Sequence, residues 1–202
     1  ALGFREVFSN RVTMCYMLCM GITFGSFIGY LNSSQQIFQD QFKTGEMFVF
    51  YFGGLALVLG AASLVNAKIV EKVGMQTICI RATCAIIVAS ALFLLVHAIT
   101  DVTLWMFVAY AAILFFSFGL MFGNINSIAM EPMGHVAGIA TAVIGATSSA
   151  MSLTIGTGIG QMYNNTLIPI VSGFFILNII SVMLMLYVQR FCLKQEKAGE
   201  NI

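Results

Sequence analysis

"AMEPMGHVAGIATAVIGATSSAMSLTIGTGIGQ", residues 129–161, decides the fold of this chain. After the polar opening of Glu131, Pro132 and His135, no charged residue follows, and Gly, Ala, Ser and Thr alternate with Ile, Val and Met. A helix that spans a bilayer needs about 20 mostly apolar residues. Transmembrane helices attract one another through small residues that let their backbones approach. The stretch therefore predicts a membrane-spanning helix that packs closely against a neighbour.

The composition of the whole chain extends this prediction to a polytopic membrane protein. Of its 202 residues, 59% are hydrophobic and 8% are charged, and the mean hydropathy is +0.95. A soluble domain carries about 25% charged residues, so this chain lacks the polar residues to cover a water-facing surface. The net charge is +1 and no basic tract is interleaved with aromatic residues, so we expect no nucleic-acid partner.

We predict an all-α membrane protein of six transmembrane helices embedded in lipid. Residues 1–11 are expected to form an amphipathic lead-in at the cytoplasmic interface, residues 12–189 the bundle, and residues 190–202 a cytoplasmic tail. Most polar residues fall in the connections, such as residues 32–46 and 68–76. The predicted spans are residues 12–31, 47–67, 77–97, 104–129, 136–160 and 167–189.

The distribution of Lys and Arg predicts the orientation, because these residues favour cytoplasmic loops. Lys43 is the one basic residue expected on the outer side. Both termini are therefore expected in the cytoplasm, with the bundle in the plasma membrane. Because three is odd, the first and last three spans enter from opposite sides, as in a three-plus-three inverted repeat. The basic residues expected on the cytoplasmic side are Arg5, Arg11, Lys68, Lys72, Arg81, Arg190, Lys194 and Lys197.

Uncharged polar residues follow helical spacing in the first and fourth spans. No Asp, Glu, Lys or Arg lies in the middle of a span, although such residues usually mark ion paths. One interpretation is that the polar residues line a substrate cavity, and the other is that they hydrogen-bond neighbouring helices. The candidate cavity residues are Tyr16, Thr23, Ser26 and Tyr30 in the first span and Ser117, Met121 and Asn124 in the fourth.

Glycines at helical spacing predict two smooth helix faces. They are suited either to sliding against a second bundle or to static packing within the same one. The candidate interface residues are Gly53 and Gly60 in the second span and Gly138, Gly145, Gly156 and Gly160 in the fifth.

Motifs for catalysis or cofactor binding are absent from the sequence. No nucleophile–base set and no phosphate-binding loop occurs, and the five cysteines form no C-x-x-C pair. We therefore expect no enzymatic activity, no cofactor and no metal site.

Three stretches resemble the C-terminal half of major facilitator superfamily transporters, specifically the Bcr/CflA-like (bicyclomycin/chloramphenicol-resistance) branch of drug:proton antiporters. They are "GSFIGYLNSSQQIFQDQF" (25–42), "NAKIVEKVGMQ" (66–76) and "FGNINSIAMEPMGHVAGIATAVIGA" (122–146). In the second stretch Glu71, Lys72 and Gly74 stand for the Asp, Arg and second Gly of the superfamily's cytoplasmic loop motif. Gly123 departs from the family pattern, which has a proline there.

The resemblance implies roles for the spans. The first and fourth would line the cavity, and the second and fifth would meet an N-terminal six-helix half, or a second copy of this chain. The parent protein would export small amphipathic compounds across the bacterial inner membrane in exchange for protons. Two alternatives remain open: transport of a specific metabolite such as a sugar or amino acid derivative, and a membrane module that binds a partner without transporting.

Overall fold

The computed structural model describes residues 2–199, and this part of the chain consists of helices joined by short connections, without a β-strand, which confirms the all-α prediction. Helices α2 to α7 are each long enough to cross a bilayer, since 25 residues of α-helix extend about 37 Å. The helices are α1 (Leu2–Ser9), α2 (Arg11–Gln36), η1 (Ile37–Gln41), η2 (Gly45–Met47), α3 (Phe48–Val73), α4 (Met75–Ile99), α5 (Leu104–Met130), η3 (Glu131–Val136), α6 (Ala137–Gln161) and α7 (Ile168–Gly199).

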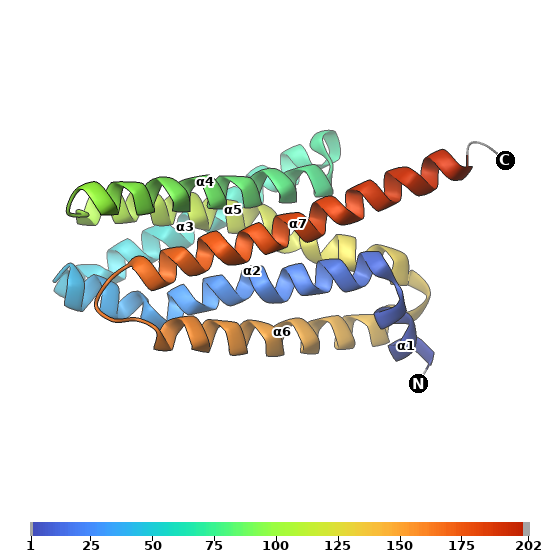
Figure 1. Cartoon of the computed structure of the whole chain (residues 1–202), viewed down its shortest axis with the longest axis horizontal. Helices are drawn as coiled ribbons and strands as arrows, with labels where there is room; N and C mark the ends of the chain where they lie inside the picture. Colours follow the sequence, from blue (N-terminus) through green and yellow to red (C-terminus); the bar gives the residue numbers. More distant parts are fainter. Residues whose placement is uncertain (1, 200–202) are drawn as a thin grey trace.

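The chain reverses direction between α5 and α6 at a short kink in an otherwise helical segment. Residues Leu104–Gln161 form one continuous apolar helical segment of 58 residues, but Met133 in η3 has φ −108° and ψ 16°, which is not helical. Pro132 lies at the start of η3, where its missing amide hydrogen costs no helical hydrogen bond. Figure 1 shows α5 and α6 as two separate passes joined at this kink, so α5 and α6 each count as a helix long enough to cross a bilayer.

Two of the predicted connections are mostly helical instead of loops. Helix α2 runs beyond residue 31 to Gln36 and continues as the π-helical turn η1. Its polar end stays helical because Ser34 donates to the carbonyl of Leu31, at 2.8 Å, and Ile37 and Phe38 are fully buried. Helix α3 likewise continues through Lys72, and Gly74, with φ +84°, makes the turn into α4.

The six long helices pack as a row of four with two helices behind it. Along the row, α6 packs on α2, α2 on α5, and α5 on α3, while α4 and α7 pack on each other and on α5 and α2 respectively. Exchanging α2, α3 and α4 with α5, α6 and α7 leaves this set of pairs unchanged: α2–α6 becomes α5–α3, α4–α5 becomes α7–α2, and the pairs α2–α5 and α4–α7 map onto themselves. The packing therefore has the two-fold symmetry of a three-plus-three inverted repeat.

The tightest seam of the row joins α2 to α6. A Cβ atom built on Gly21, Gly25 or Gly29 of α2 would lie 2.7–2.8 Å from side-chain carbons of Met151, Ile155 and Ile159 of α6, one for each glycine. The seam thus depends on a glycine every fourth residue of α2, the small-residue packing that brings transmembrane helices close.

Both ends of the chain lie at one end of the bundle. Helix α1 and the C-terminal part of α7 are together on the right of Figure 1, where α3 also turns into α4. Arg5, Arg11, Lys68, Lys72 and Arg81 gather there, and we call this the basic end. Lys43 lies at the opposite end, which we call the far end. The side chains of Lys194 and Lys197 and residues 200–202 of the predicted tail lie outside the described part of the structure.

Candidate functional site

The polar stripe of α2 points into the bundle. Thr23 and Ser181 of α7 share a hydrogen bond of 3.0 Å between their hydroxyls, and Ser26 donates to the carbonyl of Thr23 at 2.7 Å. Tyr16 is fully buried, and the ring of Tyr30 lies 5.5 Å from that of Phe115 in α5. The four residues share a face, as their spacing predicts, but this face meets α7 and α5 of the same chain rather than an open cavity.

Of the candidate residues of α5, Met121 and Asn124 contact neighbouring helices, whereas Ser117 bonds within α5 itself. Ser117 donates to the carbonyl of Ile113 at 2.8 Å, and the sulfur of Met121 lies 3.7 Å from the hydroxyl of Thr83 in α4. Asn124 exchanges two amide hydrogen bonds with Asn66 of α3, at 2.7 and 3.3 Å. Thr23, Met121 and Asn124 thus contact side chains of neighbouring helices, whereas Ser26 and Ser117 bond to carbonyls of their own helices.

We call the open face the side of the four-helix row that α4 and α7 leave uncovered. Helix α2 meets α7 through Thr23 and α6 through Gly25, so Phe24 lies on its remaining side, half buried. The Phe24 ring lies 4.4 Å from that of Phe122 in α5, and Phe27 lies 5.8 Å from Phe122. Half-buried aromatic rings therefore cover the α2–α5 seam on this face. These aromatic residues were not predicted from the sequence, because the cavity candidates were selected from the polar stripes.

The six candidate interface glycines separate into two groups. Gly156 and Gly160 pack inside the chain, because a Cβ on them would lie 2.5 Å from Ile28 and 3.2 Å from Asn32 of α2. The other four are exposed, and a Cβ on any of them would meet no atom of the described chain within 4 Å. The exposed glycines are Gly53 and Gly60 of α3 and Gly138 and Gly145 of α6.

The loop motif forms a tight turn at the basic end. Glu71 and Lys72 are exposed in the last turn of α3, and the amide of Gly74 donates to the carbonyl of Val70 at 2.9 Å. Gly74 adopts φ +84°, a conformation that residues with a side chain rarely take. The motif thus positions two exposed charges of opposite sign beside the α3–α4 turn.

Helix α1 contacts η3 and the start of α6 at the basic end. The carboxylate of Glu6 pairs with the imidazole of His135 in η3, and Gly3 packs against Ile139. Phe4 is 56% exposed, which leaves an apolar side chain facing outward from this short helix. Helix α1 therefore has the two-sided character expected of a segment at a membrane interface.

A polar pocket of about 530 Å³ opens at the far end between α2 and α6. Burial, and secondarily the nearby Asp40 carboxylate, raises the pKa of the Tyr163 phenol. The polar run that follows Tyr30 is the sequence signal for this pocket. Its lining residues are Asn32, Gln36, Asp40, Thr157, Gly160, Gln161, Tyr163 and Asn165.

Comparison with known proteins finds one distant relative to report, a Haemophilus influenzae protein described as "Bicyclomycin resistance protein homolog". The two are 22% identical over 170 residues, which is 84% of this chain and 42% of the relative. The chain therefore spans less than half the length of the relative it matches. No protein-family profile matches the chain, and no solved structure matches it.

Proposed function

We propose that this chain is a six-helix half of a drug-efflux transporter, of the Bcr/CflA-like branch of the major facilitator superfamily. The observation that carries the proposal is the open face. Helices α3 and α6 end the row with exposed glycines whose added Cβ would meet no atom of the described residues within 4 Å, while α2 and α5 present half-buried aromatic rings between them. The similarity to a relative named for bicyclomycin resistance supports the same assignment.

A second six-helix half, from the same protein or from another copy, would cover this face. Backbones approach closely where glycines meet, and lipid provides no hydrophobic force that would hold such a face by itself. Gly53, Gly60, Gly138 and Gly145 would then form the contact on which two halves move. The MEPMGH turn, with η3 in it, would close the basic end between them.

The substrate would pass along the aromatic seam between α2 and α5. Phe24, Phe27 and Phe122 offer polarisable rings without charge, which suits amphipathic compounds of varied shape. The seven polar residues of the two buried stripes would act behind this surface by fixing the rotation of α2 and α5. Since no acidic residue lies in the middle of these spans, the proton-coupling group would belong to the second half.

The orientation in the inner membrane follows from the same proposal. The basic end would face the cytoplasm, since Lys and Arg favour that side. Single cysteines at positions 43 and 72, in a background without the five native cysteines, test it by labelling intact cells with an impermeant maleimide. Labelling of position 43 but not 72 is expected, and labelling of position 72 alone would reverse the orientation.

A drug-survival assay tests the function. The complete transporter is expressed in a pump-deficient bacterial host and challenged with a panel of amphipathic drugs. Phe27→Ala is expected to weaken efflux by about tenfold, because aromatic contacts contribute about 0.5–1.5 kcal/mol each. Tyr187→Ala is the matched control, because this aromatic residue is exposed on α7 in the second layer. Equal efflux by both variants would remove the aromatic seam from the substrate path.

The far-end pocket favours one alternative, transport of a specific polar metabolite. Asn32, Gln36 and Gln161 offer uncharged donors and acceptors suited to hydroxyl-rich solutes, with Asp40 beside them. The same host separates the two: no protection against any drug, combined with uptake or export of a labelled sugar or amino acid derivative, would favour the metabolite. Absence of both activities would favour a non-transporting module.

A further inference from the structure

An apolar groove opens on the side of the bundle between α3 and α4, with α5 as its floor. Helices α3 and α4 pack far less on each other than each packs on α5, so the space between them stays open. The groove has a volume of about 520 Å³, and all but two of its 12 lining residues are apolar. Ala82 and Ala85 of α4 and Ala112 of α5 are among them, and their short side chains leave the space unfilled.

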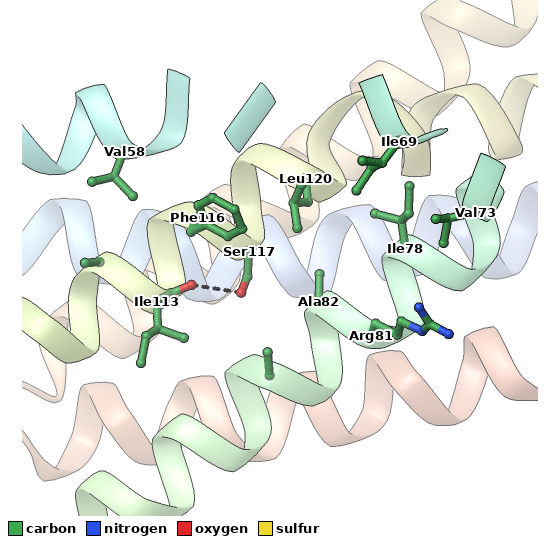
Figure 2. Close-up of a pocket in the computed structure, with 12 residues that line it drawn as sticks. Val58, Ile69, Val73, Ile78, Arg81, Ala82, Ile113, Phe116, Ser117 and Leu120 are labelled. Carbon is green, nitrogen blue, oxygen red and sulfur yellow. Dashed lines mark hydrogen bonds between the residues drawn. The ribbon is translucent and has the colours of Figure 1, made fainter. Parts of the chain in front are cut away.

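The groove runs along α3, and one of its ends lies at the basic end of the bundle. Figure 2 shows Val58 and Ile113 at one end and Val73, Ile78 and Arg81 at the other, which is the basic end. From Val58 to Val73, α3 rises about 22 Å at 1.5 Å per residue. One leaflet of a bilayer is about half of the 30 Å hydrocarbon core. The groove is therefore long enough for an acyl chain that enters from the leaflet at the basic end.

The two polar residues that line the groove, Ser117 and Arg81, differ in how free their side chains are to bind a ligand. Ser117 already donates to the carbonyl of Ile113 at 2.8 Å. Arg81 is exposed at the mouth, and none of the ion pairs found among the described side chains involves it. Lys72 lies beside Val73 in the last turn of α3 and adds a positive charge, which Glu71 in the same turn opposes. The mouth therefore offers a guanidinium to an anion.

From this arrangement we infer that the groove is a binding site for an anionic phospholipid, with one acyl chain between α3 and α4 and the headgroup phosphate on Arg81. A guanidinium binds phosphate through paired hydrogen bonds, and it is less strongly hydrated than an ammonium. The groove lies beside the open face rather than on it, so a bound lipid would not compete with the second half proposed above. The inference requires only that the bundle lies in a membrane.

The test measures lipid retained by the purified chain with native mass spectrometry. Dioleoyl phosphatidylglycerol is compared with dioleoyl phosphatidylcholine, which has the same acyl chains and no net charge. The wild type is expected to retain the anionic lipid about fivefold better, since one basic residue contributes about 1 kcal/mol to attraction of anionic lipid. Arg81→Gln is expected to abolish this preference and Arg81→Lys to keep most of it.

A second variant tests the acyl-chain part of the site. Ala85 is exposed and lines the groove, so Ala85→Phe should fill the groove without disturbing the core and lower retention of both lipids. Arg5→Gln is the matched control, because Arg5 is an exposed guanidinium at the same end, on α1. It should change neither lipid. Variants are compared only when their elution and helical circular dichroism match the wild type.

Three results would overturn the inference. The first is an unchanged lipid preference in Arg81→Gln, or a loss as large in Arg5→Gln. The second is competition by glycerophosphoglycerol at equal concentration, because that would show a site for the phosphate headgroup without its acyl chain. The third is a wild-type dimer that Ala85→Phe converts to a monomer, because the groove would then hold a second copy of the chain.

Discussion

The glycines of α2 and the exposed glycines of α6, Gly138 and Gly145, both follow helical spacing but have different surroundings. Gly25 in α2 is buried, and a Cβ on it would lie 2.8 Å from Ile155 of α6. Gly145 in α6 is exposed, and a Cβ there would meet nothing within 4 Å. The comparison teaches that glycine spacing in a membrane helix marks a close approach without saying to which neighbour. The first group packs inside this chain, and under the proposed function the second group would meet a partner outside it.

The largest effect is expected at Gly119, where α5 crosses α3. A Cβ there would clash with the backbone carbonyl oxygen of Leu59, and a backbone atom cannot move aside as the end of a flexible side chain can. Gly119→Ala should therefore cost stability near the upper end of the roughly 1–3 kcal/mol range for overpacking. The measurement is the melting temperature in detergent, with Gly123→Ala as control, because the site of its Cβ is open. Equal melting of the two variants would contradict a tight crossing.

A smaller loss is expected from Gly25→Ala in the α2–α6 seam. The clash is with the Cβ and Cγ2 of Ile155, both at 2.8 Å, and these atoms stay close to the backbone. We expect a cost of roughly 2 kcal/mol. The double variant Gly25→Ala with Ile155→Ala should recover only the part of the cost that comes from Cγ2, because alanine removes Cγ2 and keeps the Cβ of residue 155. If the second change adds a further loss instead, the seam does not depend on this contact.

Gly145→Leu should leave folding intact and impair transport in the complete protein. A branched side chain fits the open space of this half but would separate it from a second one, and unequally in inward-open and outward-open states. Transport is expected to fall about tenfold, equivalent to about 1.4 kcal/mol. The assay compares the amount of transporter in the membrane, drug binding and efflux. Normal efflux would place Gly145 against lipid, and failure to accumulate would make it a structural glycine.

The smallest effect is expected from Gly60→Ala on the exposed side of α3. With no atom within 4 Å of the new methyl group, the substitution should stabilise the helix by about 0.5–1 kcal/mol, because alanine loses less backbone entropy than glycine. Thermal melting of the chain described here measures it. A destabilisation comparable to that of Gly25→Ala would contradict the distinction between the buried glycines of α2 and the exposed glycines of α3 and α6.

The number and order of the long helices could be predicted from composition and apolar length. The structure starts α2 at Arg11 and α5 at Leu104, close to the predicted residues 12 and 104. The errors are at the ends that carry polar residues, such as the end of α2, where Ser33 and Ser34 are buried and the helix continues to Gln36. Length and hydropathy detect the lipid-facing part of a helix, and they do not register the turns that extend beyond it.

The rotation of each helix about its own axis could not be predicted. The spacing of Thr23 and Ser26 correctly placed them on one face, but α7 covers this face, and the open side of α2 carries Phe24. Similarly, Gly156 packs against Ile28 while Gly145 is open.

In water, apolar residues identify the buried side of a helix, whereas in lipid the surroundings are as apolar as the protein interior. Sequence periodicity therefore establishes only that residues share a face of a helix. Which neighbour meets that face is decided by the fit of all six helices at once, and only the tertiary structure contains that fit.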